Sequence, residues 1–104
     1  MDIQPIIVEF KKEIKKIYEN RLDKVILYGS WARGTATNDS DIDLLVVLKG
    51  KISPGREIDR MNDCITDLNL KYDTLISVVP VSSEAYTTLD TPLLLNVRRE
   101  GIAA

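Results

Sequence analysis

A glycine–serine pair and two aspartates, set a fixed distance apart, are the residues of this chain most suited to chemistry. Gly29 and Ser30 are followed after ten residues by Asp41 and Asp43, and an apolar run borders each half of the motif. The run 25–28 is β-branched and apolar, which is typical of a strand that stops at Gly29. Glycine can take positive φ and lets phosphate oxygens approach the main chain, while Ser30 adds a hydroxyl donor and the following amides open a short helix.

The two aspartates begin a second apolar run, which extends to Leu48 and is typical of a buried strand. Side chains two apart on a strand share a face, with about 6.6 Å between Cα atoms. Asp41 and Asp43 therefore point the same way, and Ile42 points into the core. Paired carboxylates suit Mg²⁺, which binds a few carboxylates together with substrate phosphates and water. A hairpin turn with two solvent-facing aspartates would explain neither the spacing nor the apolar flanks.

The stretch from Tyr28 to Val47 resembles the signature of the minimal nucleotidyltransferases of the DNA polymerase β-like superfamily. Residues 71–79 resemble the third core strand of that family, and residues 92–101 resemble its closing helix. The resemblance implies an α/β (α+β) fold, in which a small mixed sheet of about three to four strands is flanked by helices, as in the polymerase β palm. The family carries a third carboxylate on its third strand, and Asp73 is the matching position. An aspartate just before a strand is also a common turn residue.

The resemblance further implies that the chain transfers a nucleotidyl group from a nucleoside triphosphate, with ATP as the nucleotide. Asp41 and Asp43 would hold one Mg²⁺ on the nucleotide phosphates. A second Mg²⁺, shared with Asp73, would lower the pKa of the attacking hydroxyl, and Asp73 could also accept its proton. The turn at Gly29 and Ser30 would hold the leaving pyrophosphate.

Three residues near the motif have two possible roles each. Arg33 lies within a turn of the glycine–serine pair, where its guanidinium could hold phosphate oxygens, and a solvated surface arginine is the ordinary alternative. Ser40 could touch the nucleotide or cap the turn into the second strand, and capping is the commoner role. Trp31 could stack on a base, although a large aromatic beside a glycine turn more often packs against a neighbouring helix.

The acceptor of the nucleotidyl group is not defined by the motif. Minimal nucleotidyltransferases of this length resemble the antitoxin half of paired systems whose partner is a helical HEPN-type ribonuclease. That resemblance implies adenylylation of a hydroxyl, typically of a tyrosine, on the partner. Two alternatives stay open: a non-catalytic antitoxin that acts by contact, and a small-molecule nucleotidyltransferase completed by a partner subunit in a homo- or hetero-oligomer. The three acids argue against a loss of catalysis.

Length and composition narrow the remaining possibilities. The 104 residues predict one domain over 1–104 with a core of modest size. A net charge of −2 argues against a nucleic-acid template, which requires a basic face. The longest wholly apolar run is residues 44–48 and the amino end lacks a signal-peptide pattern, so we expect a cytoplasmic protein without a membrane partner. Cys64 is the only cysteine and there is no histidine, which predicts a reduced core thiol and excludes a zinc site.

Hydrophobic periodicity predicts alternating helices and strands. Helices are expected at 4–20, 53–70 and 83–87. A short helix is expected after the turn at 29–30, and a last helix is expected from 91–92 to the glycine at 101. Strands are expected at 24–28, 41–48 and 73–79, with Pro80 ending the third. The last residues are expected to form a short apolar tail.

Overall fold

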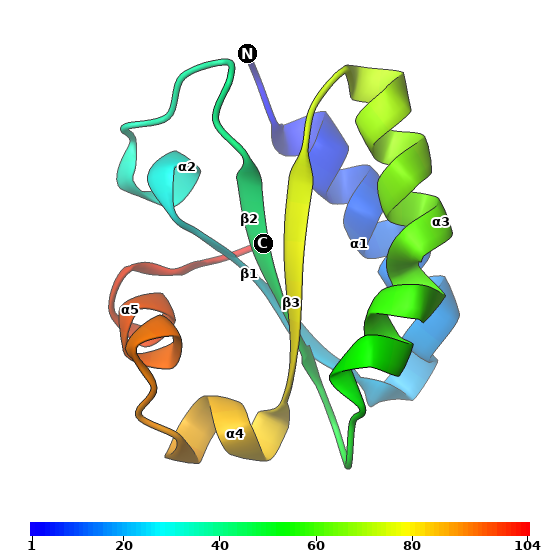
Figure 1. The fold of residues 1–104 in the computed structure, drawn as a ribbon, viewed down its shortest axis with the longest axis vertical. Helices are drawn as coiled ribbons and strands as arrows, with labels where there is room; N and C mark the ends of the chain where they lie inside the picture. Colours follow the sequence, from blue (N-terminus) through cyan, green and yellow to red (C-terminus); the bar gives the residue numbers. More distant parts are fainter.

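The structure, a computed structural model that describes residues 1–104, is a four-stranded sheet between two layers of helices (Figure 1). The strands are β1 (Leu22–Tyr28), β2 (Ile42–Leu48), β3 (Ile76–Ser82) and β4 (Ile102–Ala103). The helices are α1 (Gln4–Tyr18), α2 (Ser30–Arg33), α3 (Pro54–Tyr72), α4 (Ser83–Thr88) and α5 (Pro92–Glu100), with a 3-10 turn, η1 (Glu19–Arg21), after α1. The sheet order is β3-β2-β1-β4, in which β1 is antiparallel to β2 and β4, and β2 is parallel to β3. The mixed sheet flanked by helices is therefore confirmed.

The two faces of the sheet are covered by different helices (Figure 1). Helices α1 and α3 pack on one face, where Phe10 and Met61 are fully buried in the larger core cluster. Helix α5 packs on the other face, where Leu94 and Val97 belong to a smaller core cluster. The central strand β2 supplies side chains to both clusters, which explains why its run 44–48 is apolar without alternation.

The helices are amphipathic rather than uniformly apolar. In α1 the buried side chains Ile6, Phe10, Ile14 and Tyr18 recur at a spacing of four residues, and Pro5 occupies the first turn, where it removes no needed donor. The observed helix ends two residues before the predicted one, and η1 takes up the remainder. None of the helices combines the length and the apolar character that a bilayer crossing requires.

The third strand begins later than predicted, and Pro80 lies inside it rather than after it. Helix α3 runs on to Tyr72, with Asp73 as its C-cap, so the chain reaches the sheet only at Ile76. Proline is tolerated because β3 is an edge strand, where one side of the backbone has no partner strand. The expected third strand is therefore confirmed, but both of its predicted ends, at Asp73 and before Pro80, were wrong.

The chain end forms a strand that the sequence pattern did not predict. Ile102 and Ala103 of β4 pair with Leu27 and Ile26 of β1. The carbonyl oxygen of Ala104 also accepts a hydrogen bond from the Lys11 ammonium at 2.6 Å. A strand of two residues is too short to show a periodicity of its own.

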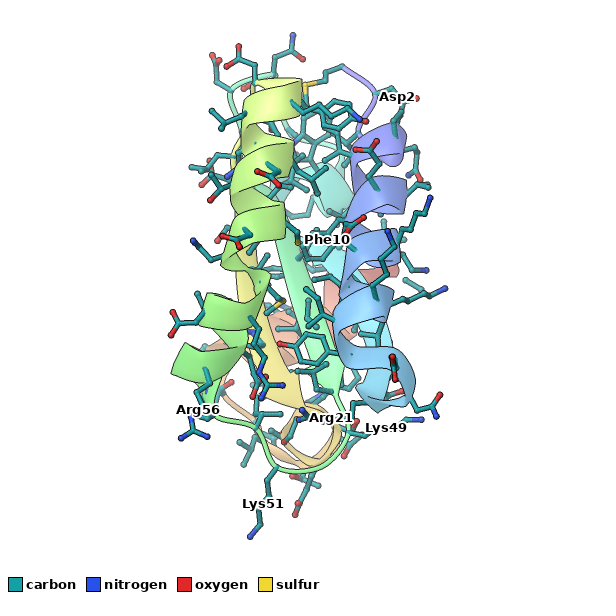
Figure 2. The ribbon with its side chains drawn as sticks, turned by 90° about the vertical axis from the view of Figure 1, so that its right-hand side faces the viewer. Asp2, Phe10, Arg21, Lys49, Lys51 and Arg56 are labelled. Carbon is teal, nitrogen blue, oxygen red and sulfur yellow. The ribbon has the colours of Figure 1, made fainter.

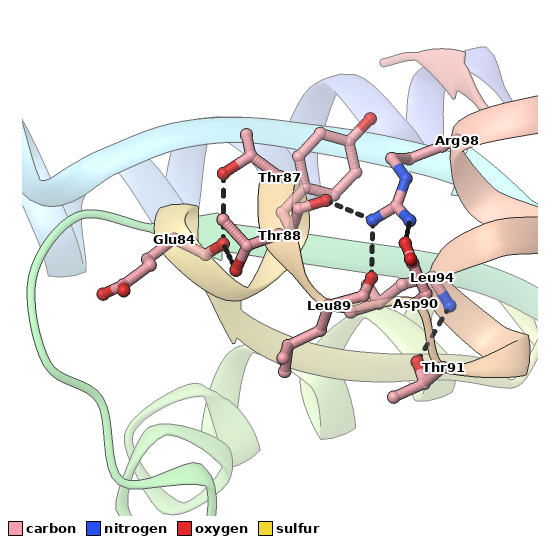
Figure 3. A network of polar contacts seen from close by, with 9 residues as sticks. Glu84, Thr87, Thr88, Leu89, Asp90, Thr91, Leu94 and Arg98 are labelled. Atoms are coloured by element: carbon pink, nitrogen blue, oxygen red, sulfur yellow. Dashed lines mark hydrogen bonds and ion pairs between the residues drawn. The ribbon is translucent and has the colours of Figure 1, made fainter.

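Arg98 stabilises the connection between α4 and α5 through polar contacts (Figure 3). Its guanidinium donates to the carbonyl oxygens of Tyr86 at 2.6 Å and Leu89 at 2.8 Å, and it pairs with the Asp90 carboxylate at 2.6 Å. Thr91 caps the first turn of α5 with its side-chain oxygen. These contacts hold α5 over the sheet face that it covers.

Cys64 is a free thiol on α3 that packs against the larger core cluster, as its place on the predicted helix indicated. Burial raises the pKa of this thiol to about 11, and the nearby carboxylates of Glu13, Asp67 and Asp63 act in the same direction. The side chain is therefore a neutral packing group at physiological pH, because the thiolate is the reactive form.

Candidate active site

The two halves of the glycine–aspartate motif meet at the end of the sheet where β1 finishes and β2 starts. The strands are antiparallel, and Tyr28 is directly opposite Asp43. The turn that follows Tyr28 therefore lies beside the first residues of β2. Ser30 opens α2 immediately after this turn, and the Gly29 carbonyl accepts the amide hydrogens of Ala32 and Arg33, each at 3.1 Å.

Gly29 is required both by its backbone and by its contact with Asp43. Its φ of +75° lies in the region that side chains disfavour, as the sequence predicted for a sharp turn. In addition, a Cβ placed on Gly29 would overlap the carboxylate of Asp43. The missing side chain thus provides the space in which this carboxylate sits beside the turn, a relationship that the linear motif did not reveal.

Asp41 and Asp43 lie on one side of the chain, with Ile42 fully buried between them. Asp43 is partly buried. Its pKa is raised above the ordinary value of 3.8, first by burial and then by the negative charge of Asp41, while the charge of Arg33 opposes the shift. Neither aspartate forms an ion pair with a basic side chain. Two carboxylates that repel each other and lack a cation partner form a donor set that suits a divalent metal ion.

Tyr28 lies beside Asp43 on the neighbouring strand and was not singled out by the motif. Its phenol is half-buried, and its pKa is raised by burial first and then by the charge of Asp43. The pairing register, which places Tyr28 opposite Asp43, is the only signal that could have indicated its position.

The third strand contributes a serine rather than an acid beside the aspartate pair. Asp43 is the register partner of Ser77 on the parallel strand β3, and partners in register point to the same face of a sheet. Asp73, the predicted third carboxylate, lies four residues earlier in the chain. Sequence spacing alone does not show which residue of a third strand stands next to Asp43.

Asp73 itself lies at the end of α3, where it has a left-handed conformation with φ of +49°. It is exposed and lines a separate hollow of about 260 Å³ with Ser40 and Thr74 among its neighbours. The structure contains no group of three or more histidine, cysteine, aspartate or glutamate side chains placed to hold a metal ion. The expected cluster of Asp41, Asp43 and Asp73 is therefore not formed, because α3 extends to Tyr72 and leaves Asp73 at the helix cap.

Arg33 lies at the edge of the site and bridges two helices. Its guanidinium pairs with the Glu100 carboxylate at 3.2 Å, which links α2 to α5. Its charge nevertheless opposes the rise in the pKa of Asp43, so the guanidinium lies within electrostatic range of the acid pair. Arg33 is about half exposed and free to exchange Glu100 for another anion.

Ser40 and Trp31 organise the loop that leads into β2. The Ser40 hydroxyl accepts the backbone N–H of Thr37 at 2.9 Å, which is the capping geometry. The Trp31 ring packs against the larger core cluster, and its indole N–H donates to the Ser40 carbonyl at 3.3 Å. Both contacts fix the approach of the chain to Asp41.

A sheet that sets a glycine–serine turn against a paired-aspartate strand is the site of a nucleotidyl-transferring enzyme. The chain belongs to the nucleotidyltransferase family, since the model of the nucleotidyltransferase domain matches residues 7–85. It is 42% identical over 79 residues to "Putative protein adenylyltransferase MJ0141" of Methanocaldococcus jannaschii, a match that covers 76% of this chain and 79% of the relative. It is 36% identical over 102 residues to "Putative protein adenylyltransferase MJ0604" of the same organism, a match that covers 97% of this chain and 96% of the relative.

Solved structures share the fold. A "putative minimal nucleotidyltransferase" superposes with a TM-score of 0.62 at 24% identity, covering 98% of this chain and 95% of that one. A toxin–antitoxin crystal structure with AMP-PNP superposes with a TM-score of 0.63 at 19% identity, covering 90% and 68%. A structure of the toxin–antitoxin MntA–HpeT superposes with a TM-score of 0.62 at 16% identity, and the match covers 99% of this chain and 71% of that one. These neighbours confirm the expected fold, while the nucleotidyltransferase family itself is shown by the match over residues 7–85.

Proposed function

We propose that this nucleotidyltransferase transfers AMP from ATP to a hydroxyl of a partner protein in the cytoplasm. We further propose that the partner is the toxin of a toxin–antitoxin pair, of the HEPN type that the sequence resemblance implies. The names of the relatives from Methanocaldococcus jannaschii support protein adenylylation. The structural neighbours support a toxin as partner, and one of them contains AMP-PNP.

The observation that carries the proposal is the close packing of the glycine turn against an aspartate pair that forms no ion pair with a basic side chain. Asp43 is held against Gly29, and its pKa is raised by burial and by Asp41. A pair in this state gains stability when a cation neutralises it. Asp41 and Asp43 would hold Mg²⁺, which when bound neutralises phosphate charge and lowers the pKa of an attacking hydroxyl.

The residues of this chain then position the reaction. The open backbone at Gly29 and the hydroxyl of Ser30 would hold the phosphates of ATP beside Asp43, whose cross-strand partner is Tyr28. The acceptor hydroxyl oxygen forms a bond to the α-phosphorus while the bond from that phosphorus to the bridging oxygen breaks, so pyrophosphate leaves. The hydroxyl gives up its proton to solvent water as the new bond forms, and the pyrophosphate keeps the electron pair of the broken bond.

Intact-mass spectrometry tests this proposal. The complex of the chain with the protein encoded beside it is incubated with ATP and Mg²⁺, and the partner is expected to gain mass in steps of one adenylyl group. The Asp41→Asn/Asp43→Asn variant should give no step. The matched control, Asp59→Asn/Asp63→Asn, removes two exposed aspartates from α3 and should behave like the unmodified chain.

A different outcome would support the contact-only antitoxin. In that case the partner stays unmodified by the unaltered chain, although the complex forms and the activity of the partner is blocked. Modification of a small molecule with an unmodified partner would instead support the small-molecule nucleotidyltransferase.

A further inference from the structure

Although the net charge of the chain is −2, several positively charged side chains lie together at one end of the molecule. Figure 2 shows Arg21, Lys49, Lys51 and Arg56 together at the end where β2 passes into α3, while Asp2 lies at the opposite end. Strand β2 separates this end from the aspartate pair, and the six residues from Asp43 to Lys49 span about 20 Å. The cationic end is therefore separate from the nucleotidyltransferase site.

These cations surround a hollow of about 340 Å³. The basic residues that line it are Arg21, Lys49, Lys51, Arg56 and Arg60. They come from three segments: η1, the turn between β2 and α3, and the first turns of α3. The three segments therefore place their cations around one hollow rather than along a single helix or strand.

One acid, Glu57, also lines the hollow, and it is already engaged by neighbouring groups. Its side chain is buried, with one oxygen accepting the Tyr18 hydroxyl at 3.1 Å and the other accepting the Ser53 amide at 3.2 Å. Arg60 approaches the same carboxylate at 3.9 Å. Glu57 therefore offsets at most one of the five positive charges.

The remaining cations form no ion pair, although Glu84 lines a neighbouring hollow together with Lys51. The side chains of Lys49, Lys51 and Arg56 form no ion pair and no hydrogen bond within the chain, and Arg21 donates only to the Lys51 carbonyl, at 3.2 Å. Like charges gathered around one hollow repel one another, and a bound anion would remove that repulsion.

We propose that this hollow binds a compact oligophosphate, such as inorganic tripolyphosphate or the 5′-triphosphate of a free nucleotide. Arginine presents a planar fork that matches phosphate oxygens, and several cations around one hollow suit a ligand whose own charges are close together. No aromatic side chain lines the hollow, so no base is stacked there. A long nucleic acid is disfavoured because the rest of the chain is acidic.

Calorimetry with tripolyphosphate in EDTA tests the site in isolation. The full chain carries Asp41→Asn/Asp43→Asn, so that the nucleotidyltransferase site and its metal do not contribute. We expect saturable binding that weakens at least about tenfold when Lys51→Gln/Arg56→Gln is added. A matched control, Lys12→Gln/Arg99→Gln, removes two exposed cations outside the hollow and should leave the affinity unchanged.

Parallel titrations with other anionic ligands test which kind of molecule the hollow binds. ATP should bind within about threefold of tripolyphosphate, because the hollow offers nothing to the base. Loss of binding in the control variant as well, or no binding at about 1 mM, would overturn the proposal. Tighter binding of a polyglutamate peptide or of a single-stranded RNA than of tripolyphosphate would also overturn it, in favour of a macromolecular partner. Since the background variant is inactive by design, these results are independent of the proposed adenylylation.

Discussion

Asp43 lies directly beside Ser77 on the parallel strands β2 and β3, and both point to the sheet face that α5 partly covers. The alternation along the strands establishes this face, since Leu45 and Val79 each follow at a distance of two residues and belong to the cluster under α5. A hydroxyl therefore occupies the third-strand position next to the aspartate pair. The site has two converging carboxylates and no third.

A carboxylate placed at Ser77 should strengthen metal binding. Ser77→Asp would add a third oxygen ligand beside Asp43, so we expect Mn²⁺ affinity in the presence of ATP to rise at least about tenfold, measured by electron paramagnetic resonance. Ser77→Asn has the same size without the charge and serves as the control. If the two variants bind Mn²⁺ equally, position 77 does not face the metal.

Alanine variants of Gly29 and Gly34 can separate two effects: the strain of a positive φ and the overlap of a Cβ with Asp43. Both have positive φ, but a Cβ on Gly34 meets nothing within 4 Å, whereas one on Gly29 overlaps the Asp43 carboxylate. Gly34→Ala should cost about 1 kcal/mol of stability and leave ATP affinity unchanged. Gly29→Ala should in addition weaken ATP binding at least about tenfold. Equal ATP affinities in titration calorimetry would show that the phosphates lie away from Gly29.

The part of the site that lies within one local motif could be predicted from the sequence. The β-branched run before Gly29 and the apolar run after Asp43 identified both strands, because β2 is central and buried on both faces. The positive φ of Gly29 followed from the sharp turn between them. The mixed sheet between helices followed from the alternation of helical and strand periodicity.

The remaining features depend on contacts between distant segments. The register that places Ser77 beside Asp43 is set by the packing of α3 and β3, and no local pattern encodes it. Whether Pro80 ends a strand depends on whether that strand lies at an edge. The cationic hollow likewise combines residues from η1, from a turn and from α3. The net charge of −2 is a total over the whole chain, so it does not show that basic residues gather at one place.

The ionised form of Asp43 should destabilise the protein when no metal is bound. Its pKa is raised above 3.8 in the folded chain by burial and by Asp41. A carboxyl with a raised folded-state pKa contributes most to stability below its unfolded pKa, and that contribution is lost as the pH rises through the folded pKa. In EDTA, Asp43→Asn should therefore raise Tm by roughly 2–4 °C at about pH 7 and by less at about pH 3.5.

The control for this pH dependence is Asp63→Asn, which removes an exposed aspartate on α3 and should change Tm little at either pH. A gain from Asp43→Asn that is equal at both pH values would contradict the electrostatic origin. It would point instead to a packing effect of the amide.

Asp73 should act as a helix cap rather than in catalysis. It has φ of +49° at the end of α3, where its backbone N–H donates to the Asn69 carbonyl, and asparagine and glycine both adopt this conformation readily. Asp73→Asn and Asp73→Gly should keep nucleotidyl transfer within about threefold of the unaltered chain, while Asp73→Ala should lose about 1 kcal/mol of stability in denaturant unfolding. A loss of transfer of about 10² in Asp73→Asn, with the fold intact, would restore Asp73 as the base that accepts the hydroxyl proton.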